Sequence, residues 1–319
     1  MPNLKEVRTR IDSVKSTEQI TSAMKMVSAS KLRKAQTTIQ DMRPYADRME
    51  ALMHRVFHPG ANPVVSPLNE YRDPENILLI GVSSNRGLCG PFNTNIGKAL
   101  MQRAQQDYER QYLNGTVDIF TIGKKAYEYL AARKVKVARR NDFLIDKFSP
   151  EMIDPLAKEL MAEFIAKKYD RIELIYHHFK NAAVQVVTVT QFLPFENPVD
   201  QKSWKPKDDF DFIFNPSLER VLELLIPKWL NLRIYETLAD SAASEHGARM
   251  IAMHKATDNA KELLRNLKLS YNKARQTAIT NEIIEIIGGL RPSKSSPGYP
   301  ILRSPFSSSH KKKHFDILP

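Results

Sequence analysis

The C-terminal part of the chain contains the feature that most limits its fold, a long stretch without helix-breaking residues. No proline lies between Lys228 and Ile287, and Gly247 is the only glycine inside that stretch. At about 1.5 Å per residue, a helix of this length spans roughly 90 Å. No single core in a chain of 319 residues is that long, so the helix must pair with another helix or project from the molecule.

The N-terminal segment has the pattern of a partner helix. Residues 3–43 contain neither glycine nor proline. Two apolar sets repeat at coiled-coil spacing, with a polar break between them that suggests a stutter. The sets are Leu4, Val7, Ile11 and Val14, then Ile20, Met24 and Val27. We expect a shaft helix over 1–57, kinked at Pro44, which packs antiparallel against a C-terminal helix over 216–289.

The C-terminal helix carries two apolar sets with small residues between them. The sets are Leu230, Ile234 and Leu238, then Leu263, Leu267, Tyr271 and Ala274. Residues 239–249 between them are rich in Ala and Ser and include Gly247. Small side chains allow helices to approach closely but bury little area, so we expect hydrophobic packing to hold this stretch weakly.

The middle of the chain alternates between strand and helix patterns, which predicts an α/β domain over 58–215 with a partly parallel sheet. The predicted strands are Ile77–Val82, Val117–Ile122, Arg171–Phe179 and Ala183–Phe192. The predicted helices are Thr94–Gln111, Lys124–Arg133 and Pro150–Tyr169. Residues 290–319 contain many prolines and serines and a lysine run, which predicts a disordered basic tail.

Charge and cysteine content narrow the classes of partner. The formal net charge is +12, but residues 58–215 carry 21 basic against 20 acidic side chains. A nearly neutral centre argues against a central nucleic-acid-binding domain. The single cysteine excludes an internal disulfide and fits a reducing compartment. The N-terminus does not resemble a secretory signal, and no run approaches about 20 apolar residues, so we expect no membrane span.

The loop "SSNRGLCGPFN" (83–93) lies between a predicted strand and a predicted helix, where many proteins hold a phosphate. Its glycine spacing fits neither the GxxxxGK[ST] nor the GxGxxG pattern. We therefore favour a tight turn with positive φ at Gly87 or Gly90. An α/β enzyme that uses this loop, and a basic coiled-coil protein that binds nucleic acid, stay open as alternatives.

The sequence contains no persuasive catalytic constellation, metal site or cofactor site. Cys89 has no histidine close to it in sequence, so we expect a buried and unreactive thiol. His177 and His178 are neighbours in a predicted strand, so they point to opposite faces and cannot easily share a metal ion.

Four motifs nevertheless resemble the γ subunit family of F-type ATP synthases, in the right order over residues 3–289. They are "ITSAMKMVSASKLRKAQ" (20–36), "SNRGLCGPFN" (84–93), "ARMIAMHKATDNAKELL" (248–264) and "LSYNKARQTAITNEIIEIIGG" (269–289). The resemblance implies an antiparallel coiled coil of the terminal helices with a Rossmann-like α/β domain inserted between them. It implies a rotor stalk that couples proton flow through a ring of c subunits to ATP synthesis at the β subunits, with no cofactor or catalytic residue of its own.

The resemblance also implies particular contact residues and partners. The positions that match the family's contact with β are Met24, Arg275, Gln276 and Thr280, and those that match its contact with the rotor ring are Phe212, Phe214 and Asn215. The implied partners are the α and β subunits, the ε subunit and the c ring, and nucleic acid is not among them. The implied location is peripheral, on the cytoplasmic face of a bacterial inner membrane.

The chain departs from the family pattern in three places. The cysteine pair of chloroplast members is absent, so we expect no thiol regulation. Asn215 replaces a common acid at the ring contact, and 30 residues follow Gly289 where most members end. The lack of a transit peptide favours a bacterial source.

Overall fold

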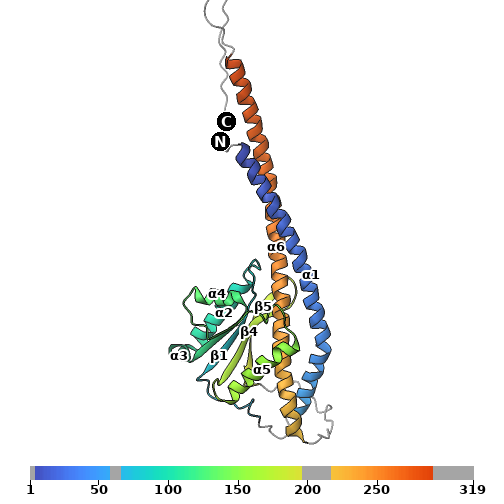
Figure 1. The fold of residues 1–319 in the computed structure, drawn as a ribbon, viewed down its shortest axis with the longest axis vertical. Helices are drawn as coiled ribbons and strands as arrows, with labels where there is room; N and C mark the ends of the chain where they lie inside the picture. The colour runs from blue at the N-terminus through green and yellow to red at the C-terminus, as the bar shows by residue number, and fades with distance from the viewer. Residues whose placement is uncertain (1–3, 58–65, 196–216, 290–319) are drawn as a thin grey trace, which may run out of the picture.

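The computed structural model describes residues 4–57, 66–195 and 217–289. Two antiparallel helices from the ends of the chain form a shaft, and an α/β domain packs against the lower half of that shaft (Figure 1). Helix α1 (Leu4–Val56) has 53 residues, and helix α6 (Leu218–Gly289) has 72. At about 1.5 Å per residue, α6 spans roughly 108 Å. The predicted antiparallel coiled coil is confirmed, and α1 continues through Pro44 without ending.

Two cross-helix contacts define the register of the shaft. Thr257 Oγ1 donates to Thr21 Oγ1 at 2.9 Å, and Lys25 Nζ lies 3.4 Å from His254 Nδ1. Continued along both helices, this register places the first turn of α1 opposite the segment of α6 near Ala274. The last turns of α6 therefore extend beyond α1 as a single helix, as Figure 1 shows.

The seam of α1 keeps its heptad phase through the polar break, so the predicted stutter is wrong. Ile20 and Val27 are 59% and 57% exposed and do not face α6. The seam instead continues from Val14 at spacings of 4, 3, 4, 3 and 4 through Glu18, Thr21, Lys25, Ser28 and Leu32, all of which are half-buried or buried. Two of these polar residues, Thr21 and Lys25, contact α6 across the seam, so a search for apolar residues alone loses the register.

The α/β domain contains one five-stranded sheet with the order β3-β2-β1-β4-β5. The strands are β1 (Ile77–Val82), β2 (Val117–Ile122), β3 (Arg139–Asn141), β4 (Arg171–Phe179) and β5 (Gln185–Leu193). Neighbouring strands are parallel except β5, which runs antiparallel to β4. Three predicted strands match at both ends. The short β3 was not predicted, because Arg-Arg-Asn offers no apolar alternation to recognise.

The helices of the domain begin close to the predicted positions and are shorter than predicted. They are α2 (Phe92–Gln102), α4 (Lys124–Ala131) and α5 (Pro150–Ile165). The single helix predicted over Thr94–Gln111 is instead α2, a π-helical turn, η1 (Arg103–Asp107), and the short α3 (Glu109–Leu113). Helix α5 begins at Pro150, where a proline costs no hydrogen bond.

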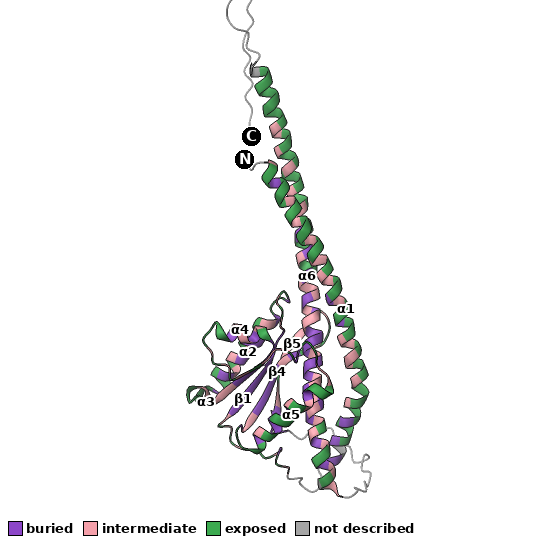
Figure 2. Ribbon diagram, in the orientation of Figure 1, coloured by how far each residue is buried: buried purple, intermediate pink, exposed green. Residues whose placement is uncertain are grey.

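Helix α6 forms one layer of the α/β domain as well as half of the shaft. One face of the sheet packs on α2 and α4, through residues such as Leu79 and Ile96. The other face, with Leu78 and Ile80, packs on α5 and on Leu230, Ile234 and Leu238 of α6. Figure 2 shows buried residues along the lower half of α6 and a mostly exposed upper end. The shaft and the domain therefore share one hydrophobic core.

The small-residue stretch 239–249 is among the most enclosed parts of α6. Ser241, Ala243 and Ser244 are fully buried, and Ser244 Oγ donates to the carbonyl of His177 at 3.2 Å. A Cβ on Gly247 would lie 3.2 Å from the carbonyl oxygen of Ala182. Small residues are needed here because the β4–β5 turn approaches the helix backbone directly.

Candidate functional site

Loop 83–93 follows the carboxyl end of β1, at the position where an enzyme of this topology would hold a ligand. In doubly wound sheets, ligands bind outside the carboxyl ends of the strands where the strand order reverses. Here that point lies between β1 and β4.

Ser84, Cys89 and Asn93 of this loop are bonded to one another. The Ser84 amide donates to Asn93 Oδ1 at 3.0 Å, and Asn93 Nδ2 donates to Cys89 Sγ at 3.1 Å. Gly90 has the predicted positive φ of 60°, and Leu88 shares this left-handed conformation with φ of 63°. Gly87 is not among the positive-φ residues of the described chain. The loop is therefore a closed turn, as the sequence predicts.

Arg249 of α6 closes the loop from the shaft side. Its guanidinium donates to the carbonyl of Arg86 at 3.0 Å and to the carbonyl of Gly87 at 3.4 Å. The same side chain forms an ion pair with Glu245 at 2.6 Å, and the two side chains are 9% and 12% exposed. Burial raises the pKa of Glu245, and the neighbouring Arg249 opposes that shift. Arg249 thus ties the shaft to the loop at the carboxyl edge of the sheet.

The single thiol and the adjacent histidines have structural positions. Cys89 is buried, and burial raises the pKa of its thiol, so the prediction of a buried cysteine is confirmed. His177 is 2% exposed and stacks on Phe92 with 4.2 Å between ring centroids. Burial lowers the pKa of His177 to about 4. His178 faces the opposite side, where its Nδ1 lies 2.6 Å from Asp240 Oδ2. No group of three or more potential metal ligands occurs within the described residues.

The predicted β-contact residues lie at two levels of the shaft. Met24 is half-buried on α1 at the level of His254. Arg275, Gln276 and Thr280 are exposed on α6, about 20 residues and so roughly 30 Å further along. Gln276 and Thr280 share one face, and the Thr280 hydroxyl donates to the Gln276 carbonyl at 2.9 Å. The structure groups the three residues of α6 and leaves Met24 apart from them.

Two exposed apolar surfaces accompany these residues and were not predicted. On α1, Ile20 and Val27 lie one turn before and after Met24 and are 59% and 57% exposed, and Met26 on another side of the helix is 66% exposed. At the end of α6, five isoleucines are about half or more exposed, namely Ile279, Ile283, Ile284, Ile286 and Ile287. Exposed apolar clusters of this kind mark surfaces that contact other proteins. In the sequence, both surfaces could have been recognised as apolar residues that do not fall on the heptad positions of the seam.

The predicted ring-contact residues Phe212, Phe214 and Asn215 lie outside the described residues, as does the tail 290–319. Among the helices that the structure describes, none has the length and apolar character of a membrane span.

Comparison with known proteins identifies relatives along almost the whole chain. The family model described as ATP synthase matches residues 3–291. The ATP synthase gamma chain of Christiangramia forsetii is 49% identical over 289 residues, which is 91% of this chain and 98% of that protein. The ATP synthase gamma chain of Bacteroides thetaiotaomicron is 40% identical over 298 residues, covering 91% and 99%.

Solved structures show the same architecture. The central stalk and c-ring structure of the Tetrahymena thermophila mitochondrial ATP synthase contains a chain with 25% identity and a TM-score of 0.51, which covers 74% of this chain and 99% of its own length. A chain of the Euglena gracilis mitochondrial ATP synthase in rotational state 3 is 20% identical with a TM-score of 0.62, covers 94% and 99%, and shares the fold. On the family match and these bacterial relatives, the chain belongs to the ATP synthase gamma chain family.

Proposed function

We propose that this chain is the central rotor stalk of a bacterial F-type ATP synthase and that it contains no catalytic site of its own. Proton flow through a membrane ring of c subunits would turn the α/β domain, and the shaft would turn with it inside the catalytic α and β subunits. The observation that carries the proposal is that α6 is both a layer of the domain core and the free end of the shaft. A torque applied to the domain reaches the tip through one continuous helix.

The two levels of exposed side chains would meet the β subunits. Arg275, Gln276 and Thr280 offer a polar face that can exchange hydrogen bonds as the shaft turns. Met24, with Ile20 and Val27 one turn away on the same side of α1, offers an apolar face at the lower level. Methionine adapts to different surroundings, which suits a contact made in turn with three similar but not identical partner conformations.

The α/β domain would form the foot of the stalk on the rotor ring, alongside the ε subunit. We infer that Phe212, Phe214 and Asn215 contribute to the ring contact and that the chain divides into 1–57, 58–215, 216–289 and a tail, 290–319. This subunit would be peripheral to the membrane, on the cytoplasmic face of the inner membrane. Nucleic acid would not be among its partners.

The two alternatives have less support. An enzyme that used loop 83–93 would need a phosphate pattern or a catalytic group there, whereas its glycine spacing fits neither phosphate pattern and its Ser84 amide already donates to Asn93. A nucleic-acid-binding protein would need a basic domain surface, whereas residues 58–215 are almost neutral overall.

The proposal is tested by assembly with purified α and β subunits. We expect the full chain to co-purify with them in one complex and to confer cooperative ATP hydrolysis that the α and β subunits lack without it. The matched control is a chain that ends at Ala274, which removes the free tip and the polar face but keeps the paired part of the shaft. Failure of the full chain to co-purify, or equal hydrolysis with and without it, would refute the role.

A further inference from the structure

A cavity of about 540 Å³ lies where α1, α6 and the first residue of α5 meet, away from the proposed β-contact surfaces. Its size falls within the range of roughly 300–1,000 Å³ that is typical of small-molecule sites. Three separate elements supply its lining, so its shape depends on how the shaft and the α/β domain are joined.

The sequence of α1 explains why the space is open. On either side of the cavity, α1 packs tightly at Leu32 and Met49, whose side chains are 6% and 5% exposed. Between them, Met42 is only half-buried and Tyr45 is 52% exposed. Pro44 lies in this part of the helix, and a proline lacks the amide donor and pushes away the carbonyl four residues before it. Figure 1 shows α1 standing away from α6 along this part of the shaft.

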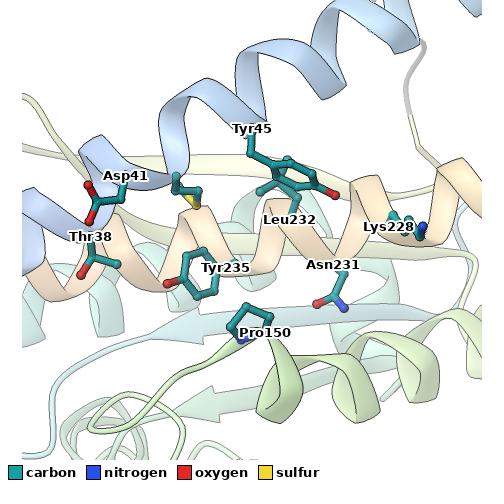
Figure 3. Close-up of a pocket in the computed structure, with 9 residues that line it drawn as sticks. Thr38, Asp41, Tyr45, Pro150, Lys228, Asn231, Leu232 and Tyr235 are labelled. Atoms are coloured by element: carbon teal, nitrogen blue, oxygen red, sulfur yellow. The ribbon is translucent and has the colours of Figure 1, made fainter.

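The two sides of the cavity are aromatic and aliphatic. Figure 3 shows the ring of Tyr45 over Leu232 on one side, with Tyr235 and Pro150 on the other. Neither phenol hydroxyl bonds to another residue in the described part of the chain. The side-chain amide of Asn231, which donates to Asp154 at 3.3 Å, also lines the space. Flat rings with free hydroxyls favour a ligand that is itself flat, aromatic and partly polar.

Opposite charges stand at opposite ends of the cavity. Figure 3 places Asp41 at the end toward Thr38 and Lys228 at the far end, beyond Asn231. Neither charged group forms an ion pair with a described residue. An unpaired ammonium favours a carboxylate, sulfonate or phosphate, and an unpaired carboxylate favours a hydrogen-bond donor.

We propose that this cavity is a binding site for a small aromatic amphiphile. The ring system of the ligand lies between Tyr45 and Tyr235, its anionic group lies at Lys228, and its donor lies at Asp41. Because such a ligand contacts α1, α6 and α5 at once, it stabilises the joint between the shaft and the domain. Binding to the folded chain alone raises the thermal midpoint with ligand concentration.

The experiment uses anilinonaphthalene sulfonate, which combines aromatic rings, one sulfonate and one N–H. The chain has two tryptophans, and Trp204→Phe leaves only Trp229, the residue next to Lys228. Trp229 then acts as an energy donor to probe bound in the cavity. Probe on the isoleucines at the tip of α6 lies 50 residues away, roughly 75 Å along the helix, and receives almost no transfer. We expect saturable transfer with one probe per full-length chain.

Three further variants, each made in the Trp204→Phe chain, test whether the probe binds in this cavity. Lys228→Met is expected to weaken binding about tenfold, since it removes a charge-assisted hydrogen bond. Leu232→Phe fills part of the cavity and is expected to weaken binding similarly. Lys268→Met is the matched control, because it makes the same change at an exposed position of the same helix. Circular dichroism verifies that each variant is folded. Absence of saturable transfer, or equal affinities for Lys228→Met and Lys268→Met, would overturn the proposal.

Discussion

Arg249 shows how one side chain can join parts of the chain that are 162 residues apart. Its guanidinium donates hydrogen bonds to the carbonyls of Arg86 and Gly87 and forms an ion pair with Glu245 at the same time. A planar fork with five donors suits this task, whereas the single ammonium of a lysine does not. The residue fixes this loop against α6 by bonding two of its carbonyl oxygens.

The first prediction concerns the ion pair between Arg249 and Glu245. Arg249→Gln leaves the buried Glu245 carboxylate without its partner, so we expect a loss of about 3–5 kcal/mol in the free energy of unfolding. Arg249→Gln combined with Glu245→Gln removes the stranded charge and is expected to recover part of that loss. Urea denaturation of the four chains measures the coupling. Strictly additive losses would show that the pair is not coupled.

The second prediction concerns the buried imidazole of His177. Its pKa is lowered to about 4 from 6.5 by burial, so the unfolded chain binds more protons than the folded chain between these values. Stability contributed by the neutral ring is therefore present above pH 6.5 and is lost as the pH falls toward 4. His246 has the same shift for the same main reason, burial, and adds to the effect.

Thermal denaturation across this pH range tests the assignment. We expect His177→Gln to be less stable at neutral pH, because its ring no longer stacks on Phe92, and to have a shallower pH dependence than the parent. His254→Gln is the control, because His254 is exposed. A slope unchanged in His177→Gln would contradict the argument.

At the scale of elements, the shaft is stabilised differently along its length. Its lower half belongs to the core of the α/β domain. Its middle contains small residues that are buried, and its upper end is a single exposed helix. The hydrophobic effect holds the lower part, close backbone approach holds the middle, and the upper end has apolar side chains without partners in the described chain. This gradient is what a shaft needs if its tip is to be covered by other subunits.

The third prediction tests the close approach at Gly247. A larger side chain there meets the backbone of Ala182, which cannot rotate away. We expect Gly247→Leu to lower the free energy of unfolding by about 1–3 kcal/mol despite its better helix propensity. Ser270→Leu, on an exposed face of the same helix, is expected to change it by less than about 0.5 kcal/mol. Equal effects at the two positions would show that the approach is not tight.

At the scale of the whole molecule, the domain and the shaft behave as one mechanical unit, because they share a core and are tied again at Arg249. Coupling between proton flow and ATP synthesis would then depend on the contacts of the shaft with its surroundings rather than on flexing within the chain.

The fourth prediction follows from the lower contact level. Met24→Lys places a charge among the exposed apolar residues of α1 while leaving the core untouched. In the assembled enzyme we expect ATP hydrolysis to continue while ATP-driven proton pumping falls several-fold. Met24→Leu keeps the apolar character and serves as the control. Pumping that stays in proportion to hydrolysis in Met24→Lys would argue against a contact at this position.

The sequence by itself determined the two long helices and three of the strands, because chain-breaking residues and hydrophobic periodicity are local properties. It also contained the family motifs, although Phe212, Phe214, Asn215 and the tail stay untested predictions. Only the tertiary structure decided that polar residues continue the seam past Val14, that Arg249 reaches loop 83–93, and that Gly247 meets Ala182. Each of these depends on a partner distant in sequence, and a side chain's own neighbours along the chain do not specify which group it will meet in space.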